Sequence, residues 1–219
     1  MTRQISSREA AAFYDRLGRG LDTQRFYEDP AADDMVAHGD FGAARHVVDF
    51  GCGTGRLAEK LLKSCLPRDA RLLALDVSAR MVEITAERLA PFGARARAVT
   101  TDGGMALPLE DGAADRVIAT YVVDLLREED ARRFIAEAHR VLEPGGLLCL
   151  VSLTVGQGPV SRAVCGLWNF LHRINPVWTG GCRPVRLAPL LGPEWELRHH
   201  RTLVRFGVPS EIVVAGKRN

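Results

Sequence analysis

The chain has 219 residues, of which 47% are hydrophobic and 26% are charged, values that suit one folded domain with a substantial core. No apolar run approaches the roughly 20 residues that a membrane-spanning helix needs. The first residues are polar and do not resemble a secretory leader, so we expect a cytoplasmic protein without a transmembrane segment. The net charge of +2 is too small to indicate a nucleic-acid partner.

The first 40 residues are expected to form helices. Residues 7–18 follow a serine and end at a glycine, which are common helix boundaries, and a second helical stretch covers about residues 22–38. Proline suits the first turn of a helix better than its interior, so we expect Pro30 to begin a new helix. Tyr14 and Tyr27 either pack these helices on the core or cover a bound ligand.

The stretch from residue 47 to residue 57 organises the rest of the chain. An apolar run contains Asp49 near its end, glycines follow at positions 51, 53 and 55, and a helical pattern then begins. This order predicts a strand, a tight turn and a helix, because glycine accepts positive φ and lets a ligand lie against bare backbone. A dinucleotide-binding turn would carry its third glycine where Arg56 stands, so that fingerprint is not met.

A second buried strand is expected over residues 71–76, and it ends in an acid. Asp76 lies about 20 residues beyond the last glycine, the spacing at which ribose-binding α/β folds place a carboxylate. Such a carboxylate has two acceptor oxygens that can face the two ribose hydroxyls. The competing interpretation is that Asp76 caps the helix that opens near Ser78.

The next two expected strands, residues 94–100 and 116–122, also end in polar side chains. The carboxyl ends of strands in a doubly wound sheet face the ligand crevice, so the side chains after the second of these strands are expected at the site, whereas those after the first are assigned by the family resemblance given below. An ordinary turn after the first of these strands and a helix-orienting acid after the second are the alternatives. The candidates at the two strand ends are Asp102, Gly103, Thr120, Tyr121 and Asp124.

The remaining pattern completes an alternation of helices and strands. Residues 128–140 are amphipathic, residues 147–153 form a buried strand, and residues 195–206 pair with 211–217 in a hairpin. The two adjacent histidines of the hairpin point to opposite faces of a strand, and the five cysteines form no C-x-x-C pair. We therefore expect reduced cysteines and no metal site.

Residues 156–194 depart from this alternation. They predict a helix followed by an irregular loop. The family resemblance given below implies that this insertion lies over the active site. The alternatives are a covering helix without substrate contact and a helix that lies on a membrane surface. Residues 159–219 carry nine Lys and Arg against three Glu, a basic balance that suits an anionic substrate, a membrane surface or a solvated face.

The order and spacing of these features resemble the class I S-adenosylmethionine (SAM)-dependent methyltransferases. The run Asp-x-Gly-x-Gly-x-Gly that starts at Asp49 matches their first motif, and Leu-x-Pro-Gly-Gly before residue 147 is frequent before their fifth strand. The resemblance covers roughly residues 40–155 and the last 25 residues. It implies an α/β fold in a single domain over residues 1–219: a Rossmann-like doubly wound sheet of seven strands in the order 3-2-1-4-5-7-6, the last strand antiparallel, with helices on both faces.

The resemblance also implies where SAM would bind. The glycine turn would pass under the methionine and ribose portions, and Asp49 would help to hold the ammonium group. Asp76 would bond the ribose, Met81 would pack on the adenine, and the turn after the third strand would read the edge of the ring. The residues implied in cofactor binding are Tyr14, Asp49, Gly51, Cys52, Gly53, Gly55, Asp76, Val77, Met81, Asp102, Gly103 and Thr120.

The activity that the resemblance implies is an in-line methyl transfer that releases S-adenosylhomocysteine. The main task of the protein would be alignment and exclusion of water. Residues 1–40 would form a lid, and with the 156–194 insertion they would enclose a small acceptor, apolar or amphipathic, as in quinone-biosynthesis and other small-molecule methyltransferases. If the acceptor must lose a proton, the candidate bases are Tyr121, Asp124 and His172.

Three rival functions stay open at this point. A nicotinamide-dependent oxidoreductase would need a dinucleotide turn, which Arg56 argues against. A SAM-binding regulatory or partner protein would show the same motifs, because methyl transfer has no obligatory catalytic side chain. A methyltransferase acting on protein or RNA fits the basic end of the chain, although no appended binding domain accompanies it. The oligomeric state does not follow from the sequence.

Overall fold

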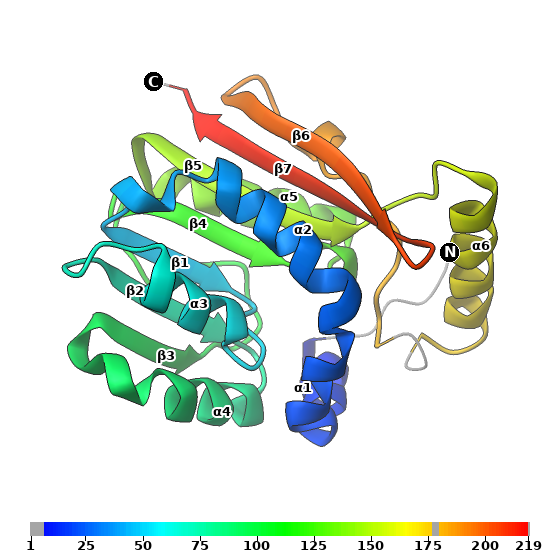
Figure 1. Cartoon of the computed structure of the whole chain (residues 1–219), viewed down its shortest axis with the longest axis horizontal. Coiled ribbons are helices and arrows are strands. Elements are labelled where there is room, and N and C mark those ends of the chain that lie inside the picture. The colour runs from blue at the N-terminus through cyan, green and yellow to red at the C-terminus, as the bar shows by residue number, and fades with distance from the viewer. Residues whose placement is uncertain (1–6, 177–179, 219) are drawn as a thin grey trace.

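A computed structural model describes residues 7–176 and 180–218 and shows one central sheet flanked by helices (Figure 1). The strands are β1 (His46–Phe50), β2 (Arg71–Asp76), β3 (Ala96–Thr100), β4 (Ala114–Thr120), β5 (Leu142–Leu153), β6 (Trp195–Arg205) and β7 (Val208–Lys217). The α-helices are α1 (Ser7–Leu17), α2 (Arg25–His38), α3 (Arg56–Ser64), α4 (Ala79–Leu89), α5 (Glu128–Val141) and α6 (Pro159–Ile174). Short 3-10 helices are η1 (Gly18–Gln24), η2 (Phe41–Ala43), η3 (Ala90–Arg95), η4 (Val123–Leu125) and η6 (Ala188–Leu190).

The seven strands lie in the order β3-β2-β1-β4-β5-β7-β6, as predicted. The five strands from β3 to β5 run parallel, with Val48 of β1 opposite Leu73 of β2 and Val117 of β4. β7 alone runs antiparallel, and it lies between β5 and β6 with Ala215 opposite Leu148. The predicted antiparallel last strand is therefore confirmed.

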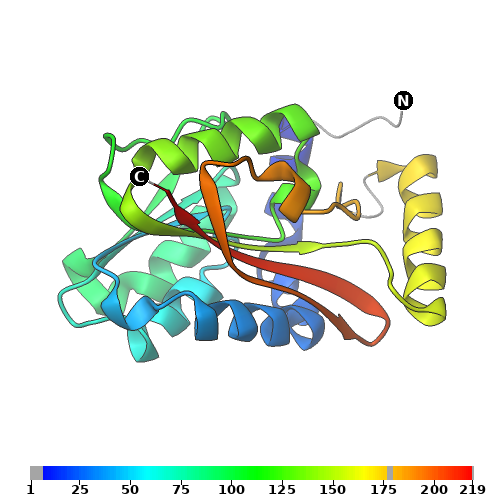
Figure 2. The same cartoon turned by 90° about the horizontal axis from the view of Figure 1, so that it is seen from above.

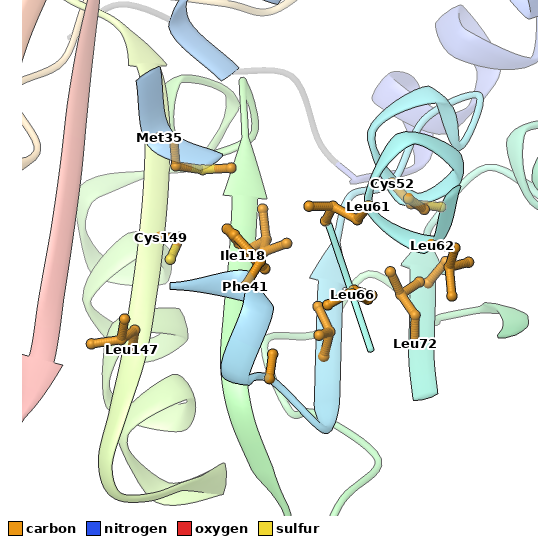
Figure 3. Packing of buried hydrophobic residues seen from close by; sticks show 14 of the residues in the cluster. Met35, Phe41, Cys52, Leu61, Leu62, Leu66, Leu72, Ile118, Leu147 and Cys149 are labelled. Atoms are coloured by element: carbon orange, nitrogen blue, oxygen red, sulfur yellow. The ribbon is translucent and has the colours of Figure 1, made fainter. Parts of the chain in front are cut away.

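Helices cover both faces of the sheet (Figure 2). The faces carry separate apolar clusters, one packed against α2 and α3 and the other against α5. In the first cluster Met35, Leu61 and Ile118 are fully buried, and Figure 3 shows how these side chains meet over the sheet. Because both faces are covered, the parallel strands are apolar along most of their length, which explains the uninterrupted runs in the sequence.

Two boundaries differ from the sequence prediction. Pro30 lies inside the single helix α2, so the prediction that it starts a new helix is wrong. Pro30 can remove only the hydrogen bond to the carbonyl of residue 26, near the exposed start of the helix, and the burial of Ala31 and Met35 holds the next turns. β5 begins at Leu142, earlier than predicted, because its first residues already pair with β4 before the two glycines shift the register.

The carboxyl ends of the parallel strands meet at one edge of the sheet. α1 and the start of α2 lie beyond this edge, and α6 stands apart at the end of the molecule near the β6–β7 turn (Figures 1 and 2). No helix among residues 7–176 and 180–218 is long and apolar enough to cross a membrane. The edge of the sheet, together with the N-terminal helices, thus provides the place for a site.

Candidate active site

The glycine turn after β1 is shaped for close approach of a ligand. Gly51 has a φ of +72°, and a Cβ added there would lie 2.3 Å from Cγ2 of Val122. Gly53 also has positive φ, at +53°. The amides of Gly51 and Cys52 both donate to the carbonyl of Leu75, at 2.8 Å and 2.9 Å, which ties the turn to the end of β2. Only glycine fits the first of these positions, and the bare backbone that results faces the site.

Asp76 is held beside this turn by backbone donors. Its Oδ2 accepts from the amide of Gly53 at 2.8 Å, and its Oδ1 accepts from the amide of Ser78 at 2.9 Å. Burial raises the pKa of Asp76, whereas the bonds from the amides of Ser78 and Gly53 lower it. Each carboxylate oxygen can accept a second bond, so two acceptor positions remain for a diol. The capping of α4 falls to Ser78, whose Oγ accepts from the amide of Met81 at 3.1 Å.

The turn and the strand ends border a cavity of about 770 Å³. The N-terminal helices form its roof, where Oγ of Ser78 donates to Asp15 and Oγ1 of Thr54 donates to Asp22, each at 2.5 Å. Most residues that the sequence assigns to the site line this cavity. They are Tyr14, Gly51, Cys52, Gly53, Asp76, Val77, Met81, Gly103, Thr120, Tyr121 and Asp124.

Three residues predicted to bind the cofactor do not line the cavity. Asp49 is only 1% exposed behind the turn, and burial, with a smaller contribution from the charge of Asp76, raises its pKa to about 7. Gly55 packs against Thr85, which leaves no room for a Cβ. Oδ1 of Asp102 accepts from a backbone amide two residues later, at 2.8 Å, so its carboxyl closes a local turn. Direct cofactor contacts by these three residues remain predictions.

Aromatic side chains gather at the end of the cavity nearest β4 and the N-terminal helices. The rings of Tyr27 and Tyr121 meet edge to face with centroids 5.7 Å apart, and Tyr14 also lines this end. Tyr121 has a φ of +56°, an uncommon conformation for a residue with a bulky side chain. The hydroxyl oxygen of Tyr121 lies 2.8 Å from Oγ of Ser210, which is hydrogen-bond distance. Burial raises the pKa of Tyr121, so its hydroxyl is a poor candidate for a base at neutral pH.

Asp124 lies at the same end, in η4 directly after β4. Its side chain is fully buried, and burial raises its pKa to about 7, although Ser152 and Cys182 nearby lower it. Neither carboxyl oxygen makes a hydrogen bond of normal geometry within the described residues. The groups beside this carboxyl are the side chains of Ser152 and Cys182 and the backbone of Leu153. A buried carboxyl with so few well-placed donors calls for an explanation.

Comparison with known proteins assigns this arrangement to a family. Residues 47–146, which include the glycine turn and Asp76, match a family described as a methyltransferase domain. The chain belongs to the class I SAM-dependent methyltransferases. SAM is therefore the cofactor, and the residues fit it, because bare backbone at Gly51 and Gly53 and the spare acceptor positions of Asp76 face one cavity.

The relatives of this methyltransferase chain include enzymes of different substrates. The malonyl-[acyl-carrier protein] O-methyltransferase of Hahella chejuensis is 34% identical over 146 residues, which are 66% of this chain and 47% of that protein. Methyltransferase GfsG of Streptomyces halstedii is 28% identical over 170 residues, which are 68% of this chain and 59% of that protein. The chain spans about half the length of these curated relatives.

Solved structures share the fold of the methyltransferase chain over nearly its whole length. The [4+2]-cyclase SpnF superposes with a TM-score of 0.73 and 18% identity, covering 99% of this chain and 98% of that one. A putative methyltransferase of Bacillus halodurans superposes with a TM-score of 0.68 and 14% identity, covering 87% of this chain and 100% of that one. At these identities the likeness concerns the fold, and one of the two proteins is a cyclase.

Sequence reasoning missed two titratable groups of the methyltransferase cavity. Glu28, in the first turn of α2, lines the cavity, and burial raises its pKa to about 7 against the opposing effect of Arg56. Cys182 lies beside Asp124, with its Sγ 4.0 Å from the hydroxyl of Tyr14. Neither residue belongs to a local motif, because the fold brings them to the cavity from segments 154 positions apart. The amphipathic character of α2 is weak, which gave no signal for the position of Glu28.

One predicted catalytic residue falls outside the cavity. His172 is buried on the inward face of α6, and burial together with the charge of Arg183 lowers its pKa. It does not line the cavity, so the structure gives no support to the prediction that it acts as a base there. The physical reason is that α6 stands beside the end of the sheet, whereas we expected it to extend over the site.

A cluster of two histidines and an acid lies elsewhere, between α2 and β6. Ligand atoms of Asp34, His38 and His199 all lie within 4.8 Å of one another. The two rings stack with centroids 3.6 Å apart and 5° between their planes, so a single ion cannot lie in both ring planes. Asp34 also accepts from Arg201 at 2.7 Å, while His200 faces Glu211 on the other side of the strand. We interpret the cluster as a polar clamp between α2 and β6.

Proposed function

We propose that this chain transfers the methyl group of SAM to a hydroxyl or amine of a small amphipathic acceptor. The observation that carries the proposal is Asp124, a fully buried carboxyl that lines the SAM cavity without a hydrogen bond of normal geometry within the described residues. An acceptor with an O–H or N–H group would bring a further donor to this carboxyl, beside the side chains of Ser152 and Cys182. Tyr14, Tyr27 and Tyr121 would pack against the apolar part of the same molecule.

The charges of the cavity support a neutral or basic acceptor over a carboxylate. Five Lys and Arg side chains line the cavity, and four of them pair with acids. Glu28 and Asp124 lie at the acceptor end, and a carboxylate placed there would be repelled whenever they are ionised. The four paired cations are Arg56 with Asp29, Lys60 with Asp33, Lys63 with Glu59 and Arg88 with Asp22.

The N-terminal helices would act as a lid in this function. Asp15 and Asp22 bind Ser78 and Thr54, so α1 and η1 are fastened over the glycine turn. Arg88 also donates to Asp22, at 2.9 Å. A closed lid excludes water and lets the protein align the acceptor. Residues 1–6 of the predicted lid and residues 177–179 of the predicted insertion lie outside the described part of the chain.

The mechanism assigns separate tasks to the side chains at the acceptor end. Bound SAM supplies an activated methyl group on a sulfonium. Asp124 in its ionised form accepts the proton of the acceptor group at a carboxyl oxygen. Burial raises the pKa of the three tyrosines, so they remain protonated at neutral pH and contribute shape and hydrogen bonds without acting as bases.

The first experiment identifies the acceptor. Purified protein is incubated with SAM labelled on its methyl group and with a cell extract that contains small molecules, and the products are separated into organic-soluble, aqueous and precipitated fractions. We expect label in the organic-soluble fraction or, for a polar amine, in the aqueous one. Label only in the precipitate would replace the proposal with a protein or RNA acceptor. Binding of SAM without label in any fraction, over extracts of several sources, would favour a SAM-binding partner protein.

The second experiment tests Asp124 with the acceptor found by the first. We expect Asp124→Asn to lower kcat/KM by about 100-fold or more while SAM affinity stays close to that of the wild type. At saturating SAM, the wild-type kcat/KM for the acceptor should rise with pH up to about 7, where the Asp124 carboxyl ionises, and this rise should be smaller in the variant. Glu28→Gln shows how much of the pH dependence comes from Glu28, the other cavity acid whose pKa is raised to about 7. Asp130→Asn, at the rim of the cavity, is the control that should change little.

A further inference from the structure

Large apolar side chains are exposed almost entirely at one end of the molecule. Nine such side chains are exposed among the described residues, and only Leu197 lies away from this end. The end comprises α6, the β6–β7 turn and the start of α2 (Figure 1). We call it the α6 surface. Its exposed apolar residues are Phe26, Val155, Val160, Leu167, Phe170, Ile174, Val204 and Phe206.

α6 has one face fixed to the protein and another, apolar face that residues 7–176 and 180–218 leave exposed. Nε1 of Trp168 donates to the carbonyl of Cys182 at 3.0 Å, and Cys165 is buried on the same side. Since 3.6 residues make one turn, Val160, Leu167, Phe170 and Ile174 fall within about 80° of the circumference. Leu167 and Phe170 are each 60% exposed. Nothing in the packing of the described residues explains why this stripe is apolar.

The β6–β7 turn continues the apolar stripe toward α2. Phe206 at its tip is 79% exposed. The rings of Phe206 and Phe26 meet edge to face with centroids 5.4 Å apart. A Cβ added at Gly207 would lie 3.0 Å from Cγ2 of Val164 on α6, so the turn and the helix are in contact. Three elements thus share one surface.

Along α6 and the β6–β7 turn the charge of the α6 surface has a single sign, whereas at the start of α2 the acids Glu28 and Asp29 follow Phe26 and Asp29 pairs with Arg56. Residues 154–193 contain four arginines and neither Asp nor Glu, and residues 200–210 also lack acids. Arg162 and Arg173 are exposed on α6, and Arg205 is exposed beside Phe206. The partner of the surface must therefore tolerate or prefer negative charge.

We propose that the α6 surface docks on an anionic membrane. Its apolar side chains project singly from a helix and a turn and are flanked by arginines, the arrangement with which interfacial helices enter the headgroup region of anionic lipids. An acidic protein would satisfy the arginines, but it would have to supply a groove for each projecting side chain. The lipid surface needs no such match, and the observations favour it.

Docking would also place the cavity next to the lipid. Leu153 and Cys182 line the cavity, and on their other side they border α6, where Leu153 and Trp168 share a small crevice. An amphipathic acceptor dissolved in the membrane would then have a short way to Asp124. This consequence rests on the proposed function, whereas the docking itself does not depend on methyl transfer.

The test is sedimentation with vesicles. Vesicles of phosphatidylcholine mixed with phosphatidylglycerol should bind the protein at low salt, vesicles of phosphatidylcholine alone should bind it more weakly, and added salt should reduce the first binding. We expect the double variant Leu167→Ser, Phe170→Ser to lower the partition coefficient at least about tenfold, because both exposed side chains lose apolar area. Arg162→Glu with Arg173→Glu should lower it by a similar factor.

The control is Leu197→Ser on β6, the exposed apolar residue that lies away from the surface. It should bind vesicles as the wild type does, and SAM affinity measured for every variant shows that the cavity is intact. Three results would overturn the proposal. The first is that the wild type does not bind anionic vesicles. The second is that Leu197→Ser weakens vesicle binding as much as the α6 variants do. The third is that the protein binds no vesicles but associates with an acidic carrier protein, or with a second copy in light scattering, and that the α6 variants abolish this association.

Discussion

The two halves of the cavity are built in different ways. The cofactor half comes from one short segment, residues 51–81, in which a glycine turn, Asp76 and Met81 follow one another across β2. The acceptor half is assembled from distant segments, and its Tyr14 and Cys182 are 168 positions apart. Local backbone geometry therefore determines the first half, whereas the packing of the whole fold determines the second.

The carboxyl groups of the two halves show the same contrast. Asp76 already accepts two backbone hydrogen bonds, which hold it in one orientation before any ligand arrives. Asp124 makes no hydrogen bond of normal geometry within the described residues, although the side chains of Ser152 and Cys182 lie beside it. A preorganised acid suits a cofactor that never varies. In the proposed function Asp124 would make the acceptor half selective, because an acceptor with a donor group gains a hydrogen bond that a molecule without one cannot form.

The largest expected effect is the loss of SAM affinity when Asp76 in the cofactor half is replaced. We expect Asp76→Ala to weaken SAM binding about 100-fold, because each hydrogen bond to a charged group contributes roughly 1.5–3 kcal/mol and two ribose hydroxyls are involved. Calorimetric titration measures it, and circular dichroism checks that the variant is folded. Asp69→Ala is the control, since that exposed carboxyl pairs with Arg45 and does not line the cavity. Unchanged affinity of Asp76→Ala would remove it from the ribose site.

The sequence predicted which residues of the glycine turn and of the end of β2 line the cavity, while their contacts with the cofactor stay a prediction. The glycine spacing at Gly51 and Gly53 and the acid at Asp76 are local signals, because a bare turn and a strand-end carboxylate need particular residue types at particular positions. The strand order followed from the same resemblance, and the sheet confirms it. Gly55 shows the limit of this reasoning, because it belongs to the turn but does not line the cavity. A glycine can be required by positive φ and close packing as well as by contact with a ligand, and the sequence does not distinguish these reasons.

The acceptor half was predictable only in part. Tyr121 and Asp124, which line the cavity, were predicted because they follow a strand. Glu28 and Cys182 line it as well, but they belong to no motif and were not predicted. His172 was assigned from its residue type within an expected insertion, whereas its helix packs beside the sheet. Packing between segments that are distant in the sequence determines which side chains reach this half of the cavity. The hydrophobic periodicity of a single segment does not indicate such packing.

The next effect concerns Asp49, the buried carboxyl behind the glycine turn, and its interaction with the positive charge of SAM. Burial keeps the pKa of Asp49 near 7, so in the free protein this carboxyl is largely protonated in mild acid. SAM carries positive charge and favours the ionised form, so we expect SAM affinity to rise with pH toward about 7 and to level off above it. Asp49→Asn should weaken SAM binding about tenfold at neutral pH, the equivalent of 1.4 kcal/mol, and should reduce this pH dependence.

Calorimetry over a pH series measures this effect, and Asp124→Asn provides the comparison because its pKa is also raised to about 7. If Asp49→Asn binds SAM as the wild type does at every pH, Asp49 serves only to pack behind the turn. If both variants reduce the pH dependence of SAM affinity equally, the positive charge of SAM interacts with Asp49 and Asp124 to the same extent. The two halves of the cavity would then not differ in this respect.

The smallest effect tests whether Tyr121 is a structural part of the acceptor half. Tyr121→Phe keeps the ring against Tyr27 and removes the hydrogen bond with Ser210. We expect the free energy of unfolding to fall by about 1 kcal/mol and kcat to change little, because the raised pKa keeps this hydroxyl protonated. Denaturant titration of Tyr121→Phe, Ser210→Ala and the double variant should give a double-variant loss smaller than the sum of the single losses. A large fall in kcat with a changed pH profile in Tyr121→Phe, but not in Ser210→Ala, would instead place the Tyr121 hydroxyl in proton transfer.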